Sequence, residues 1–260
     1  MKSNYVEVND LKLHYIEKGE GCPLILLHGG ITIAEENWEN QIDFFSESFR
    51  VIATDSRGHG KTNNPSGEFS YKLMADDIAA LVRELKLEKP LIIGWSDGGQ
   101  IVLEIGIRYP ELAKALVAGG VLSEITDYYT NTMKFWGIEG PGQVNFERLR
   151  EVIPQFTEKL PEIHTAGHGE DYWKKLLQDI SKMWCDPKAF PKEEIENIND
   201  PILILAGDHD EASSIDECVK MFKLIPNAEL AIIPKAGHDV YETKPELFNS
   251  IVLEFLLRHK

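Results

Sequence analysis

The segment Gly94-Trp95-Ser96-Asp97-Gly98 has the residue types and spacing of a nucleophilic serine on a tight turn. It directly follows the apolar run Leu91–Ile93 and precedes a helical pattern. A serine held between a strand and a helix needs glycine two positions before and after it, because the backbone is strained and closely packed there. Choosing Asp97 as the nucleophile instead would put the bulky Trp95 where a small residue belongs. We therefore predict Ser96 as the nucleophile.

A serine hydroxyl is a weak nucleophile unless a histidine accepts its proton and a carboxylate orients that histidine. Asp210 and His238 supply these groups, and each follows an apolar run, Ile202–Leu205 and Leu230–Ile233 respectively. Sites in open α/β sheets form at the carboxyl ends of the strands. The order Ser96, Asp210, His238 along the chain is also the order expected with a serine on this kind of turn. We predict a catalytic triad of these residues.

A glycine turn after another apolar run could stabilise negative charge on a reacting carbonyl oxygen. His28-Gly29-Gly30 follows Leu24–Leu27, and small residues there can aim backbone N–H groups at an oxyanion. The partner donor would be the backbone N–H of Asp97, at the start of its helix. We predict Gly30 and Asp97 as the oxyanion hole, with Ile31 as the next choice after Gly30.

The elements that must position these residues alternate between strand and helix patterns. Residues 5–8 and 11–17 alternate in polarity like an exposed hairpin, while other runs are apolar throughout, as in a sheet covered on both faces. Apolar residues three and four apart predict helices, for example over 74–85 and 251–256. This alternation predicts a doubly wound α/β fold with a sheet mixed at one edge. The predicted strand cores are Leu11–Ile16, Leu24–Leu27, Val51–Ala53, Leu91–Ile93, Ala115–Ala118, Ile202–Leu205 and Leu230–Ile233.

The alternation stops near Val121 and resumes near Pro201. The interval has no strand-like run and carries tyrosines and tryptophans among helical stretches, which are broken at Gly140-Pro141-Gly142. We predict a core of residues 1–121 and 201–260 and an inserted helical cap of residues 122–200. The aromatic rings of the cap either form their own small core or also line a pocket.

Composition and charge limit the classes of partner. The chain has 260 residues, of which 43% are hydrophobic and 27% charged, as in ordinary globular proteins. The formal net charge of −16 would repel nucleic acid and anionic membranes. The apolar stretches are too short to cross a bilayer, the N-terminus lacks the apolar core of a secretion signal, and the cysteines (Cys22, Cys185, Cys218) are widely separated. We expect a cytoplasmic protein that acts on a small molecule.

These motifs give the chain a resemblance, over nearly its full length, to α/β-hydrolase-fold serine hydrolases with a helical cap. The resemblance implies a mostly parallel, eight-stranded sheet flanked by helices, with Ser96 as nucleophile, Asp210 as acid and His238 as base. It also implies that residues 55–62 form a structural turn, so that His59 is not catalytic. The matching motifs are His28-Gly29-Gly30, Asp55–Thr62, Gly94–Gly98, Gly207–Asp210 and Gly237-His238.

The serine turn further resembles that of biphenyl-hydrolase-like and valacyclovirase-like esterases. In that group the acid after the nucleophile is associated with recognition of an α-amino group on the acyl part of the ester. By electrostatics, Asp97 beside the reaction centre would favour a cationic substrate and penalise an anionic one. The alternative is that its side chain makes only local hydrogen bonds. Asp97, Trp95 and Ile31 are our candidates for substrate binding.

Two other carboxylates are alternatives to Asp210. Asp208 lies close by, but the family spacing selects the third residue after Gly207, which leaves Asp208 as a turn-stabilising side chain. Glu124, just beyond the run Ala115–Ala118, occupies a place from which some relatives supply the acid. It is the reserve candidate.

A possible metal motif lies in the inserted segment. His164 and His168, followed by Glu170 and Asp171, have a spacing compatible with metal ligation. They lie in a glycine-containing loop without a second cluster of ligands. We predict no required metal and no cofactor.

The residues together predict a serine hydrolase that cleaves carboxylic esters of small molecules through an acyl-enzyme. The same triad could serve a lactonase or enol-lactonase, a C–C bond hydrolase or a cofactor-free perhydrolase. A non-catalytic small-molecule receptor is an alternative from a different class, because hydrolase folds also serve as receptors. The complete triad favours catalysis.

Overall fold

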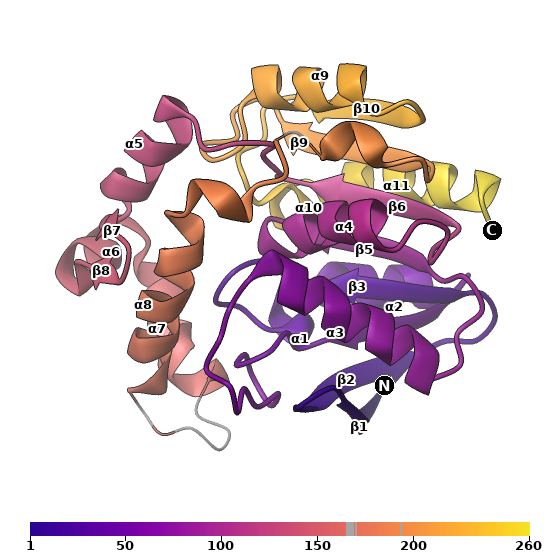
Figure 1. Ribbon diagram of the computed structural model, residues 1–260, viewed down its shortest axis with the longest axis horizontal. Helices are drawn as coiled ribbons and strands as arrows, with labels where there is room; N and C mark the ends of the chain where they lie inside the picture. The colour runs from indigo at the N-terminus through magenta and orange to yellow at the C-terminus, as the bar shows by residue number, and fades with distance from the viewer. Residues whose placement is uncertain (165–168, 170, 193) are drawn as a thin grey trace.

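An eight-stranded sheet forms the centre of a computed structural model of the protein, which describes residues 1–164, 169, 171–192 and 194–260 (Figure 1). The strand order is β1-β2-β4-β3-β5-β6-β9-β10. Every predicted strand is present. The strands are β1 (Lys2–Val8), β2 (Leu11–Lys18), β3 (Pro23–Leu27), β4 (Arg50–Thr54), β5 (Leu91–Trp95), β6 (Ala115–Gly119), β9 (Ile202–Gly207) and β10 (Ala228–Ile233).

The sheet is mixed at one edge, as the polarity patterns predict. Strand β2 is antiparallel to both β1 and β4, whereas β4, β3, β5, β6, β9 and β10 are mutually parallel. All residues of β5, β6 and β9 are buried. Because helices cover both faces of these strands, inward and outward positions are alike apolar.

Helices pack on both faces of the sheet (Figure 1). One face is covered by α3 (Tyr71–Glu84), α4 (Asp97–Arg108) and α9 (Ile215–Leu224), and the other by α1 (Ala34–Asn37), α2 (Glu39–Ser46), α10 (Val240–Thr243) and α11 (Pro245–Arg258). Helix α3 begins where the Ser70 side chain accepts a hydrogen bond from Leu73 N–H, and it buries Met74, Ile78 and Leu81. The doubly wound α/β prediction is confirmed.

Most of the chain between β6 and β9 lies to one side of the sheet (left in Figure 1). We call its helices α5–α8 the inserted helices. They are α5 (Asp127–Phe135), α6 (Phe146–Val152), α7 (Pro154–Ile163) and α8 (Tyr172–Trp184), followed by single 3-10 turns η1 (Pro187–Ala189) and η2 (Ile195–Asn197). Among the helices of the described ranges, none is long and apolar enough to cross a membrane.

The expectation that this interval holds no strand was wrong. Strands β7 (Ile138–Gly140) and β8 (Gln143–Val144) pair as an antiparallel two-stranded sheet. Gly140-Pro141-Gly142, the predicted helix break, lies at the turn of this hairpin. Strands of three and two residues carry too few side chains to show an alternating pattern.

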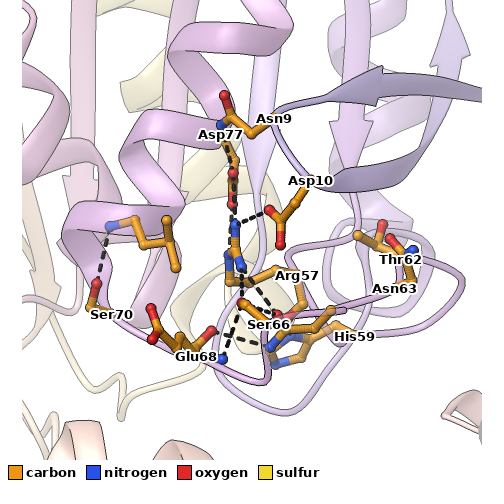
Figure 2. Close-up of polar contacts among 12 residues, drawn as sticks. Asn9, Asp10, Arg57, His59, Thr62, Asn63, Ser66, Glu68, Ser70 and Asp77 are labelled. Carbon is orange, nitrogen blue, oxygen red and sulfur yellow. Dashed lines mark hydrogen bonds and ion pairs between the residues drawn. The ribbon is translucent and has the colours of Figure 1, made fainter.

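The turn after β4 is fastened to the core by Arg57, whose side chain is fully buried. Its guanidinium donates from Nε to Asp77 Oδ2 at 2.8 Å and from Nη2 to Asp77 Oδ1 at 2.9 Å. Figure 2 shows it between Asp77 on α3 and Asp10 in the β1–β2 hairpin, to which Nη2 also donates at 3.3 Å. This two-bond fork to a buried carboxylate fixes the turn against α3.

Candidate active site

Ser96 occupies a sharp turn between β5 and α4, as predicted. Its φ of 55° and ψ of −118° are strained for a residue with a side chain. The flanking glycines are needed because other backbone comes very close. A Cβ on Gly98 would lie 2.1 Å from Leu27 O, and a Cβ on Gly94 would lie 2.0 Å from Gly98 O. The turn therefore cannot form with larger residues at these positions.

His238 and Asp210 form a directly bonded pair. His238 Nδ1 lies 3.0 Å from each carboxylate oxygen of Asp210. The Asp210 side chain is completely buried, and Oδ1 also accepts hydrogen bonds from the backbone N–H groups of Ala212 and Ser213, both at 2.8 Å. With its Nδ1–H donating to the carboxylate, the ring presents Nε2 as a proton acceptor.

The surroundings of His238 favour its protonated form. Burial alone would lower the pKa of His238, but the Asp210 carboxylate, helped by Asp239 and Glu211, outweighs it and raises the pKa to about 9. His238 can act as general base only in its neutral form, whose share increases as the pH rises, and the Asp210 carboxylate stabilises the imidazolium that forms when the ring accepts the serine proton.

The two alternative acids are engaged elsewhere. Asp208 Oδ1 accepts from His209 Nδ1 at 2.6 Å and from the Ala236 backbone N–H at 3.2 Å, so its carboxylate stabilises the turn. Glu124 pairs with Lys192 and Lys220, and these lysines lower the pKa of its carboxyl group. Within the described part of the chain, neither carboxylate is bonded to His238.

The glycine turn after β3 lies against the start of α4. A Cβ on Gly30 would be 2.7 Å from Asp97 Oδ2 and 2.5 Å from the Trp184 ring, so only glycine fits there. Ile31, the second choice for an oxyanion donor, is not free for that role, because its N–H donates to His59 Nε2 at 3.3 Å. Gly30 and Asp97 are left as the candidate donors.

The Asp97 side chain is 7% exposed and points toward α3 and α8. Asp97 Oδ1 accepts hydrogen bonds from Tyr71 OH and Trp184 Nε1, both at 2.8 Å. Burial nevertheless raises the pKa of Asp97 to about 6, because it outweighs these two hydrogen bonds and the nearby charge of His238, which act to lower the pKa. Tyr71 and Trp184 were missed at the sequence level, since they lie 26 and 87 residues away and share no motif with the serine turn.

A cavity of about 770 Å³ brings the candidate residues together. It is lined by Gly30, Ile31, Ser96, Asp97 and His238 from the loops at the carboxyl ends of the strands, and by residues of the inserted helices. The aromatic rings of the inserted segment both line the cavity and form a small core of their own. Some line the cavity, namely Tyr129, Phe156, Trp136 and Trp184, whereas Trp173 packs at 5.5 Å against Phe146 within the inserted helices.

The charged groups around this cavity are mostly acidic. Apart from His238, Lys159 is the one basic residue among its described lining residues, and it is paired with Glu36 at 2.9 Å. The acidic lining residues are Glu36, Glu39, Asp97, Glu211, Asp239 and Glu242. An anionic group entering the cavity would therefore meet repulsion from several sides.

Trp95 borders the cavity but offers little surface to a ligand. Its side chain is 1% exposed and packs against the rings of His238, Tyr241 and Phe248, with centroid distances of 6.2, 5.5 and 5.7 Å. Trp95 therefore supports the His238 ring by packing against it.

The structure describes only some of the residues in the histidine-containing segment for which no required metal is predicted. His164 and Asp171 are described, whereas His168 and Glu170 fall outside the described residues. Among those that are described, no group of three or more histidine, cysteine, aspartate or glutamate side chains is arranged to hold a metal ion.

Known proteins resemble this chain in sequence. Residues 24–251 match the model of the alpha/beta hydrolase family. The chain is 26% identical over 270 residues to the 2-hydroxy-6-oxo-6-(2'-aminophenyl)hexa-2,4-dienoic acid hydrolase of Metapseudomonas resinovorans, covering 98% of this chain and 90% of that protein. It is likewise 26% identical over 265 residues to the human serine hydrolase BPHL, covering 96% of this chain and 85% of that protein.

Solved structures show the same fold. The meta-cleavage product hydrolase CumD from Pseudomonas fluorescens IP01 superposes with a TM-score of 0.83 at 24% identity, covering all of this chain and 98% of that one. At this identity the likeness concerns the fold.

Proposed function

Since the chain belongs to the alpha/beta hydrolase family, we propose that it is a serine hydrolase that cleaves carboxylic esters of small molecules through an acyl-enzyme on Ser96. The observation that supports this proposal most is the bond between His238 and the buried Asp210, because His238 lines the same cavity as the strained serine turn. A lone serine turn also occurs without catalysis, whereas a buried carboxylate that orients a histidine beside it is what nucleophilic activation requires.

In the proposed reaction, Ser96 Oγ attacks the ester carbonyl while His238 Nε2 accepts the serine proton. The N–H groups of Gly30 and Asp97 hold the oxyanion, and losing one such donor typically costs about 3–4 kcal/mol of transition-state stabilisation. His238 then protonates the departing alcohol. Water then attacks the acyl carbonyl while His238 accepts its proton, and His238 returns that proton to Ser96 Oγ as the bond to the acyl group breaks and the acid leaves.

The charges around the cavity favour ester hydrolysis over the reactions that the names of several relatives give. The Metapseudomonas resinovorans hydrolase acts, by its name, on a dienoic acid. A carboxylate in this cavity would face several acids, while Lys159 is already paired with Glu36. We therefore favour neutral or cationic esters over carboxylate-bearing C–C bond substrates.

We also propose that residues 122–200 act as a helical cap on a core formed by residues 1–121 and 201–260, because the inserted helices line the cavity opposite the strand ends.

The net charge of −16 supports a small-molecule substrate over nucleic acid or an anionic membrane surface, and we propose a cytoplasmic location.

A matched pair of activated esters tests the substrate class. One carries a neutral short acyl chain and the other an α-amino acyl group. We expect the wild type to hydrolyse both and to prefer the α-amino ester, because Asp97 is a buried acid without a cationic partner among the described residues. The preference, measured as a ratio of kcat/KM values, should decline as the pH falls through about 6, where Asp97 takes up a proton.

The variant Asp97→Asn should lose this preference. Tyr71→Phe is the matched control, since it removes one hydrogen bond from Asp97 and leaves the charge, so the preference should remain. An unchanged preference in Asp97→Asn would mean that Asp97 makes only local hydrogen bonds. Failure of the wild type to hydrolyse either ester would contradict the proposed ester chemistry.

A further inference from the structure

Ile31, the residue after the proposed oxyanion donor Gly30, has a φ of 52°. For a β-branched residue this left-handed conformation is a genuine outlier. Such strain persists only where the surroundings hold the backbone firmly, and it concentrates at functional sites. The contacts that hold Ile31 are therefore informative.

Two histidine rings bond the two peptide groups of Ile31. The Ile31 N–H donates to His59 Nε2 at 3.3 Å, and the Ile31 carbonyl oxygen accepts from His164 Nε2 at 3.1 Å. Both rings are almost fully buried, with residue exposures of 2% and 1%, and they lie edge to face with centroids 5.8 Å apart. Both hydrogen-bonding groups of the strained residue are thus occupied.

His59 is itself fixed from the core. Its Nδ1–H donates to the Arg57 carbonyl at 2.9 Å, and Arg57 is the residue held by the buried fork to Asp77. The His28 ring packs against it with centroids 5.0 Å apart. Burial, together with the nearby His28 and His164 rings, lowers the pKa of His59 well below its ordinary value, so Nε2 stays an acceptor at neutral pH.

His164 reaches the same loop from the inserted helices, directly after α7. Its Nδ1 accepts from the Gly60 backbone N–H at 3.2 Å, while its Nε2–H donates to Ile31. One ring therefore ties α7 both to the turn that carries His59 and to the loop that carries Gly30.

This external support matters because Gly29 and Gly30 are adjacent glycines, whose backbone is intrinsically permissive. On the N-terminal side, the Gly29 N–H is held by Asn37 Oδ1 at 2.9 Å. On the C-terminal side, His59 holds the Gly30–Ile31 peptide through the Ile31 N–H, and His164 holds the following peptide through the Ile31 carbonyl. Between these anchors, the direction of the Gly30 N–H is fixed before substrate arrives, which is what an effective oxyanion donor needs.

We propose that His59 and His164 are positioning residues, which hold the oxyanion loop in its active geometry by bonding the N–H and the carbonyl of Ile31. The inference rests on the proposed function, since it gives the loop its role. Because His164 connects α7 to the oxyanion loop, this contact between α7 and the core would then help to stabilise the transition state.

Paired amide variants test it, because asparagine places a polar atom near histidine Nδ1 and glutamine places one near Nε2. His164→Gln keeps the donor to Ile31 and loses the bond to Gly60, whereas His164→Asn does the reverse. For His59, glutamine likewise keeps the bond to Ile31 and asparagine keeps the bond to Arg57. We expect both Asn variants to lower kcat about 10- to 100-fold with KM changed less than about threefold, and both Gln variants to stay within about fivefold of wild type.

A boronic acid inhibitor that forms a tetrahedral adduct with the nucleophilic serine gives the second readout, and its affinity should follow kcat across the variants. Tyr172→Phe is the control, since Tyr172 OH ties α8 to the Gly58 carbonyl at 2.9 Å, whereas the N–H and the carbonyl of Ile31 are bonded by the two histidines. It should leave kcat unchanged, and melting temperatures establish that each variant is folded.

Equal losses in the Asn and Gln variants, accompanied by lower melting temperatures, would reduce the two histidines to a purely structural role and overturn the inference. So would wild-type kcat in folded Asn variants. Failure of the proposed function looks different, because the wild type itself would then hydrolyse no ester and Ser96→Ala would change nothing.

Discussion

Ser96→Ala is expected to lower kcat by about 10⁵- to 10⁶-fold while leaving the fold intact. The change removes only Oγ, from a half-buried residue, and keeps the backbone conformation available. Without the hydroxyl there is no nucleophile for the acyl-enzyme, so only the activation of water by the remaining groups is left. Steady-state hydrolysis of the neutral activated ester, together with the melting temperature, measures both parts of the expectation.

Ser250→Ala serves as the control for this variant. Ser250 is exposed on α11, away from the cavity, and its loss should change neither activity nor stability. If Ser96→Ala were as active as wild type, the nucleophile would have to be another residue and the proposed mechanism would fall.

Asp210→Asn is expected to lower kcat by about 10⁴-fold. An amide can donate to His238 Nδ1 and so stabilise the wrong tautomer, with the proton on Nε2. The pH profile should move as well. In the wild type the neutral, active form of His238 grows in as the pH rises through its pKa of about 9. Because Asp210 is the main group that raises this pKa, the acid limb of the kcat/KM profile in Asp210→Asn should lie at lower pH.

Asp208→Asn and Glu124→Gln are the matched carboxylate controls. Asp208 bonds to His209 and to the Ala236 backbone, and Glu124 pairs with two lysines, so both changes should alter kcat by less than about fivefold. A severe loss in Asp208→Asn with a mild one in Asp210→Asn would show that the acid had been assigned to the wrong residue.

The core of the fold could be predicted because its strands are covered on both faces. Runs such as Leu91–Ile93 and Ile202–Leu205 are apolar at every position, and this is visible without any alignment. The candidate site residues follow such runs closely, so the carboxyl edge of the sheet places them near one another. The close approach of Gly98 to Leu27 explains why the serine turn has a recognisable spacing.

The contacts between the inserted helices and the core could not be predicted. Trp184 bonds to Asp97 and His164 to Ile31, but these pairs are 87 and 133 residues apart and depend on how the helices sit on the sheet. His164 was noticed only as a possible metal ligand, because the spacing of two histidines does not say which backbone groups they meet. The hairpin β7–β8 escaped notice because its strands are too short to carry a pattern.

The most direct test of the central claim is to trap the acyl-enzyme. Wild-type protein is mixed with the neutral activated ester, quenched in acid before the steady state, digested, and analysed by peptide mass spectrometry. The proposed mechanism predicts a mass increase equal to the acyl group on the peptide that contains Ser96, and no such increase in Ser96→Ala. Rapid turnover of the ester with the acyl group on a residue other than Ser96, or undiminished turnover by Ser96→Ala, would contradict it.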